Sequence, residues 1–238
     1  KEDTKMKKTQ KGFTLVELLV VTMIIMILSG ILLPVLTQAK QKAQGIKCMC
    51  NLRQMTFAWT LYAMDSEDKL LPNHPLKPER QWIKAYFRAG VKNNPDHTNT
   101  VHLKESYLSS YLEKTDVYKC LSDKTRNLHS RAGVDKSIPW VRSVGMNRWM
   151  GGIKNKLYNT FHRLSQIDRP ADRMTFINQR ADTLENGYYF NGSVGLFDPS
   201  RLRWYEFPAH YHNDSTTLAF ADGHTENHQW KTDWPTLK

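Results

Sequence analysis

Five titratable side chains near the C-terminus are the first candidates for chemistry: His210, His212, Asp222, His224 and His228. A neutral imidazole is a good zinc ligand, and a tetrahedral site needs four donors that converge on one ion. On a strand, however, His224 and His228 would lie ~13 Å apart at ~3.3 Å per residue, too far for one ion. We therefore predict no metal, with His212 and Asp222 as weak candidates only. The predicted role is structural, with a hydrogen bond from His212 to the Asp222–Gly223 turn.

Motifs for covalent or phosphate chemistry are absent from the sequence. There is no Gly-x-Ser-x-Gly nucleophile elbow and no Gly-rich phosphate-binding loop of Walker type. The sequence therefore predicts neither an enzyme nor a cofactor.

Glu17 is the only ionisable residue in an apolar run from Phe13 to Leu36. At ~1.5 Å per residue, a helix of that length reaches ~36 Å and crosses a ~30 Å hydrocarbon core. A secretory signal has a shorter apolar part and a small-x-small cleavage site, which this run lacks. A carboxylate inside a bilayer is costly and is retained mainly where it has a partner. We therefore expect a membrane helix over residues 13–36, with the partner of Glu17 supplied from outside the segment.

Gly12-Phe13-Thr14-Leu15-Val16-Glu17 resembles the processing site of type IV prepilins and type II secretion pseudopilins. The resemblance implies a leader at residues 1–12, which a prepilin peptidase removes after Gly12 before N-methylating Phe13. It also implies that Glu17 pairs with the N-terminal amine of a neighbouring subunit, and that Pro34 bends the helix.

The apolar pattern continues beyond the membrane segment and predicts one long helix. Over residues 37–64, an apolar face recurs at steps of three and four, and other apolar side chains widen it. The face consists of Cys48, Leu52, Met55, Trp59 and Tyr62, widened by Ile46, Phe57 and Leu61. The charged stretch Asp65–Lys69 and Pro72 predict the end of this amphipathic half.

Residues 65–238 are predicted to form an α+β domain, with a small antiparallel sheet on which the long helix packs. Two amphipathic stretches, residues 81–91 and 103–114, predict short helices. A C-terminal hairpin is expected at about residues 216–230, with Asp222-Gly223 as a type I′ turn. In that hairpin, Thr225 and Asn227 would lie opposite Leu218 and Phe220.

Several further motifs resemble a class of prepilin-like proteins with a C-terminal His-x9-Asp-Gly signature. They are Cys48-x-x-Asn51-Leu52-Arg53-Gln54, Tyr62-Ala63-Met64-Asp65, Cys120-x-Ser122-Asp123, Gly145-Met146-Asn147, the stretch Ile167–Phe176 and His212-x9-Asp222-Gly223. Cys50 departs from the pattern of this class.

Three cysteines allow one intramolecular disulfide at most. Cys48 and Cys50 point to different sides of a helix and cannot form a disulfide with each other. Any intramolecular disulfide therefore joins Cys120 to either Cys48 or Cys50. Cys48 shares the apolar face and, by resemblance, occupies the position of the helix cysteine. We predict a Cys48–Cys120 disulfide, the alternative being three reduced thiols buried as small apolar groups.

Charge distribution predicts topology and bears on partners. Residues 1–12 carry +3 of the net charge of +11. Lysines before an apolar span favour a cytoplasmic N-terminus, so we expect a single-pass bacterial inner-membrane protein with a periplasmic or extracellular domain. The basic domain could attract nucleic acid or acidic polysaccharide, but no binding motif supports either.

Two functions follow from these expectations. The first is a structural subunit of a type IV pilus-like or type II secretion pseudopilus filament. Its partners would be the prepilin peptidase/N-methyltransferase, other pilin or pseudopilin subunits and inner-membrane lipid. The alternative is a membrane-anchored display protein with a polysaccharide- or DNA-binding domain.

Overall fold

The computed structural model describes residues 12–74, 77, 81–85, 87, 91, 94–131, 134–153, 160–184, 187–189 and 206–230. The predicted leader therefore lies outside the described residues apart from Gly12. The chain divides into two compact units, Lys1–Lys40 and Gln41–Lys238.

The long helix predicted from the sequence is α1, Leu15–Asp65. It contains Pro34, and the Thr37 hydroxyl donates to the Leu33 carbonyl within the same helix. The helix ends where Glu67 adopts a positive φ of 55° and the Asp68 N–H bonds to the Ala63 carbonyl at 2.8 Å. This is the Schellman arrangement, in which a left-handed residue reverses the chain and satisfies a terminal carbonyl.

The first unit is dominated by the apolar part of α1. Its large apolar side chains from Leu15 to Leu36 are exposed, and α1 is the one helix among the described residues that is long and apolar enough to cross a membrane. An apolar surface of this extent has no stable place in water. The N-terminal part of the helix therefore fits a membrane anchor.

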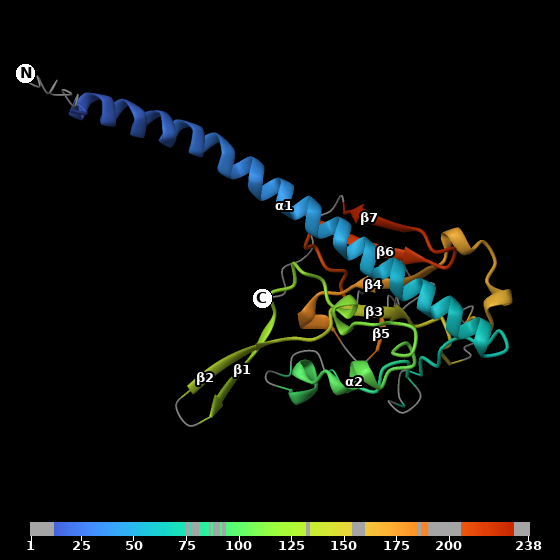
Figure 1. The fold of residues 1–238 in the computed structure, drawn as a ribbon. Helices are drawn as coiled ribbons and strands as arrows, with labels where there is room; N and C mark the ends of the chain where they lie inside the picture. The colour runs from blue at the N-terminus through green and yellow to red at the C-terminus, as the bar shows by residue number, and fades with distance from the viewer. Residues whose placement is uncertain are drawn as a thin grey trace, which may run out of the picture. The chain divides into compact units, whose positions relative to one another are not determined.

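The second unit contains a five-stranded sheet with the strand order β5-β3-β4-β6-β7 (Figure 1). Neighbouring strands are antiparallel except for β3 and β5, which are parallel. A separate antiparallel pair consists of β1 (Arg126–Arg131) and β2 (Val134–Pro139). The sheet strands are β3 (Val144–Asn147), β4 (Met174–Asn178), β5 (Tyr188–Tyr189), β6 (Ser215–Phe220) and β7 (Thr225–Gln229).

Short helices lie between α1 and β1 and in the connections between later strands. Besides α2 (Val101–Lys104), they are the 3₁₀ helices η2 (Pro95–Thr98), η3 (Thr115–Tyr118), η4 (Leu164–Gln166), η5 (Pro170–Asp172) and η6 (Ala181–Thr183). Together with the sheet they confirm the predicted α+β class, a long helix packed on a small, mainly antiparallel sheet.

The second half of α1 packs on this sheet and forms the main core. Met55 and Trp59 are fully buried and belong to one apolar cluster with Met146 of β3 and Phe176 of β4. The Thr56 hydroxyl also lies 3.3 Å from the Thr175 hydroxyl of β4. Large apolar side chains on one helix face thus position α1 against the sheet through burial of apolar surface.

The widening of the buried helix face predicted from the sequence is wrong. Ile46, Phe57 and Leu61 are 57%, 48% and 49% exposed, whereas Asn51 and Thr56 are buried. Burial follows the side of the helix that meets the sheet, so polar residues on that side are enclosed and apolar residues beside it are not.

The two short helices predicted between α1 and the sheet are largely wrong as well. The described residues of 81–91 contain no helix, and within 103–114 only the end of α2 is helical. Ile83 and Ala85 are buried on either side of the exposed Lys84, and this alternation follows the two-residue period of extended backbone.

The C-terminal hairpin is formed by β6 and β7, but its turn differs from the prediction. The Gly223 N–H bonds to the Phe220 carbonyl, so Ala221 and Asp222 are the central residues. Gly223 follows with φ of 92°, and Asp222 is not among the residues with positive φ. A longer turn ending in a left-handed glycine replaces the type I′ turn. The register shifts accordingly, and Ala219 pairs with Thr225.

Candidate functional sites

The predicted processing site lies at the start of α1. Phe13 is 74% exposed and lies two residues before the first residue of the helix, Leu15. Thr14 and Glu17 form a reciprocal capping box. The Thr14 N–H and hydroxyl donate to Glu17 Oε2 at 2.8 and 2.7 Å, and the Glu17 N–H donates to Thr14 Oγ1 at 3.2 Å. Two main-chain donors of the first turn are thereby satisfied.

This local role of Glu17 was not predicted from the sequence, where a partner of opposite charge was expected from outside the segment. The signal was present in Thr14-x-x-Glu17, the spacing typical of a capping box before an apolar run. Both capping hydrogen bonds that Glu17 accepts from Thr14 end on Oε2. Among the described residues, the cap therefore occupies only one of the two oxygens of the Glu17 carboxylate.

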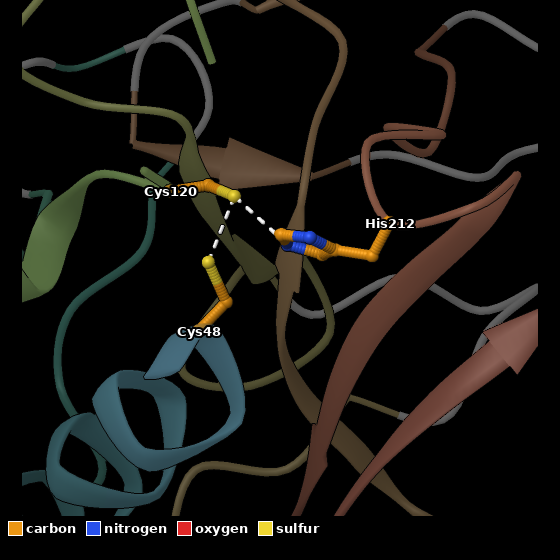
Figure 2. Close-up of side chains that lie close together, drawn as sticks. All are labelled: Cys48, Cys120 and His212. Carbon is orange, nitrogen blue, oxygen red and sulfur yellow. Dashed lines mark hydrogen bonds between the residues drawn. The ribbon is translucent and has the colours of Figure 1, made fainter. Parts of the chain in front are cut away.

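Cys48, Cys120 and His212 form a buried cluster in the second unit (Figure 2). The sulfurs of Cys48 and Cys120 are 2.8 Å apart, and Cys120 Sγ lies 3.1 Å from His212 Nε2. The three side chains come from α1, from the segment after η3 and from the turn before β6. Their exposed fractions are 1%, 1% and 6%, so the cluster is enclosed by the domain.

The other ring nitrogen of His212 has its own partner. The Ser122 hydroxyl donates to Gln44 Oε1 at 2.9 Å, and Ser122 Oγ lies 3.3 Å from His212 Nδ1. Because the hydroxyl proton points to Gln44, the oxygen accepts from His212, which assigns the ring proton to Nδ1. His212 Nε2 then presents its lone pair to Cys120.

Gly45 allows the His212 ring to pack against α1. A Cβ atom at this position would lie 3.4 Å from both Cβ and Cγ of His212 and 3.0 Å from Asn227 Nδ2. Glycine in a helix interior costs roughly 0.5–1 kcal/mol relative to alanine. The close approach of His212 gives this helix-weakening residue a structural reason.

The two thiols differ in acidity. The hydrogen bond between the two thiols lowers the pKa of Cys48, while burial opposes the shift, and a main-chain hydrogen bond from Leu121 and the charge of Lys47 lower it further. The hydrogen bond to Cys48 raises the pKa of Cys120 well above its usual range, and burial adds to the rise.

The predicted pairing of the cysteines concerns this same cluster. Cys48 lies beside Cys120, whereas Cys50 is exposed on α1. All three cysteines are free thiols in the structure, so the Cys48–Cys120 disulfide stays a prediction.

The predicted hydrogen bond between His212 and Asp222 is wrong. His212 bonds to Cys120 and Ser122, while Asp222 Oδ1 accepts from the His224 N–H at 3.0 Å and lies 2.6 Å from His224 Nδ1. The turn at Asp222–Gly223 is therefore stabilised by hydrogen bonds to His224 and not by His212. The two weak metal candidates, His212 and Asp222, therefore bond to different residues, and of the two only His212 lies beside the cysteines.

The convergence of His212 with two cysteines was not predicted from the sequence. A signal was present in the motifs that resemble one class, because Cys48, Cys120 and His212 each begin one of them.

The fold and the N-terminal site define a protein with a membrane-anchoring helix whose second half belongs to an α+β domain. Residues 7–33 match the model of the prokaryotic N-terminal methylation motif. The chain thus carries a prepilin-type N-terminal segment, consistent with a pilin or pseudopilin. The match does not extend to the C-terminal His-x9-Asp-Gly motif. No curated protein and no solved structure matches the chain.

Proposed function

We propose that this protein is a structural subunit of a type IV pilus-like or type II secretion pseudopilus filament. The observation that carries the proposal is the methylation motif at residues 7–33 at the head of a 51-residue helix. The N-terminus lies in the cytoplasm before processing, and the domain lies on the other side of the inner membrane. The prepilin peptidase cleaves after Gly12 and methylates Phe13.

Assembly proceeds through the N-terminal part of α1. After cleavage, the amine of Phe13 is positive, and Glu17 of an adjacent subunit is negative. In a medium of low dielectric constant their attraction sets the axial position of one subunit relative to the next. The hydrogen bonds of Glu17 support this step. Both bonds from Thr14 end on Oε2 of the carboxylate, which leaves Oε1 for a second partner.

Exposed apolar side chains on the domain half of α1 support packing between subunits. Phe57 and Leu61 are about half exposed, and both line a groove of ≈ 600 Å³ whose other lining residues are partly apolar, such as Leu121, and partly charged, such as Lys47 and Glu113. Exposed apolar side chains rimmed by polar ones commonly mark a protein contact.

Mass spectrometry of the mature protein tests the proposal. We expect N-methylated Phe13 as the first residue, and co-purification of other pilin-like subunits from sheared filaments or cross-linked membranes. An uncleaved Gly12–Phe13 bond would refute processing. A correctly processed protein found without other subunits would favour the membrane-anchored display protein.

A further inference from the structure

We infer that Cys48, Cys120 and His212 form a binding site for a divalent thiophilic cation, with Zn²⁺ as its natural representative. This inference goes beyond the proposed filament role and does not depend on it. The three potential ligand atoms lie within 4.8 Å of one another, and all three residues are buried.

The ligand set is that of a zinc site with three protein ligands. Zn–S distances of about 2.3 Å in a tetrahedral site place two sulfurs about 3.8 Å apart. From the observed 2.8 Å, the sulfurs of Cys48 and Cys120 need to separate by about 1 Å on binding. Small changes of side-chain torsion supply such a shift, and a water molecule completes the fourth position.

His212 favours a metal site over a simple pair of thiols. A disulfide uses only two of the three residues. A metal uses all three, and the tautomer inferred from the Ser122–Gln44 hydrogen bond is the one that ligation needs, with Nδ1–H bonded to Ser122 and the Nε2 lone pair directed into the cluster. Histidine ligands of metals almost always donate their second ring N–H in this way.

Charge balance selects a divalent ion. Binding removes one proton from each thiol, so M²⁺ with two thiolates and a neutral imidazole carries no net charge, and two protons are released. A monovalent ion such as Cu⁺ would leave one negative charge in the same buried space, and burial of an uncompensated charge is costly. The bound ion would join segments that are 72 and 92 residues apart in sequence.

Cobalt titration tests the site on the full-length chain in detergent, purified with reductant and stripped of metal by a chelator. We expect one equivalent of Co²⁺ to give the thiolate-to-cobalt charge-transfer band and the visible bands of a tetrahedral site, both bleached by Zn²⁺. Cys50→Ser is the matched control and should bind as the parent does. Cys48→Ser and Cys120→Ser should lose the charge-transfer intensity.

Ser122→Ala keeps every ligand and removes only the partner of His212 Nδ1. Because such outer partners typically contribute 10–100-fold in affinity, we expect Co²⁺ binding about 10-fold weaker, with the domain still folded by circular dichroism. His212→Gln should weaken binding further.

Three results would overturn the inference. The first is the absence of a thiolate–cobalt band in folded, reduced protein, or a band that survives Cys48→Ser and Cys120→Ser. The second is a Cys48–Cys120 disulfide in protein isolated from the envelope without reductant. The third is tight Cu⁺ binding, measured by competition with a chromophoric chelator, without any binding of Co²⁺ or Zn²⁺.

Discussion

The paired variants Glu17→Gln and Glu17→Ala separate the two roles of Glu17. Glutamine keeps an acceptor oxygen for the Thr14 N–H and is itself a regular member of capping boxes. It therefore preserves the local bonds to Thr14 while it removes the negative charge. Alanine removes both, and Thr14→Ala removes the side-chain half of the cap while it leaves the charge.

The two roles differ in magnitude. A pair of unit charges about 4 Å apart at an effective dielectric constant of about 20 contributes about 4 kcal/mol, a factor of about a thousand in association. Loss of a helix cap costs about 1 kcal/mol, a factor of about five. Glu17→Gln and Glu17→Ala should thus both abolish assembly, whereas Thr14→Ala should reduce it only a few-fold.

The assay compares the sheared filament fraction with the membrane fraction by immunoblotting. The two Glu17 variants should insert normally, because removal of an intramembrane carboxylate favours insertion. Thr14→Ala should also insert normally, because it leaves the apolar run and its charge unchanged. Mass spectrometry of each N-terminus controls for processing, since an uncleaved chain has no free Phe13 amine.

Normal assembly of a processed Glu17→Gln protein would refute the charge-pairing argument and leave the capping box as the role of Glu17. A Thr14→Ala defect as large as that of Glu17→Ala would lead to the same conclusion.

Two further predictions concern the domain. Trp59→Ala should lower the free energy of unfolding by about 3–5 kcal/mol, because its side chain is fully buried, whereas Phe57→Ala, half exposed on the same helix, should change it by less than about 1 kcal/mol. Urea denaturation followed by far-ultraviolet circular dichroism measures both, and equal effects would contradict the packing of α1. Burial, with Arg142 nearby, lowers the pKa of His97, while Asp96 opposes the shift. The unfolded chain then binds the proton first, so stability should fall as pH drops below about 6.5, by at most about 1.4 kcal/mol per pH unit from this residue. His97→Gln should remove that part of the slope, and an unchanged slope would refute the assignment.

Local features of the chain were predictable from the sequence. The helix from Leu15 to Asp65, its apolar first half and its exit at the charged turn depend on residues within a few positions of one another. The hairpin of β6 and β7 is similarly local. The α+β class followed from these elements and the composition of the strands between them.

Tertiary structure decided which side of each element is buried. On α1, Asn51 and Thr56 are enclosed while Ile46 and Phe57 are exposed, because the sheet approaches from one direction that a helical period alone does not specify. Among residues 81–85, burial of Ile83 and Ala85 on either side of the exposed Lys84 replaces the helical period that the spacing predicts. The hairpin register depends on one left-handed residue, Gly223, and a shift by one residue changes every cross-strand pair.

The candidate sites divide in the same way. Gly12, Phe13 and Glu17 are recognisable from a contiguous motif, because processing and capping are local events. Cys48, Cys120 and His212 are far apart in sequence, and only the packing of α1, the segment after η3 and the turn before β6 brings their ligand atoms within 4.8 Å. The physical reason is that long-range contacts depend on how buried surfaces of separate elements fit together, and no spacing within one segment contains that information.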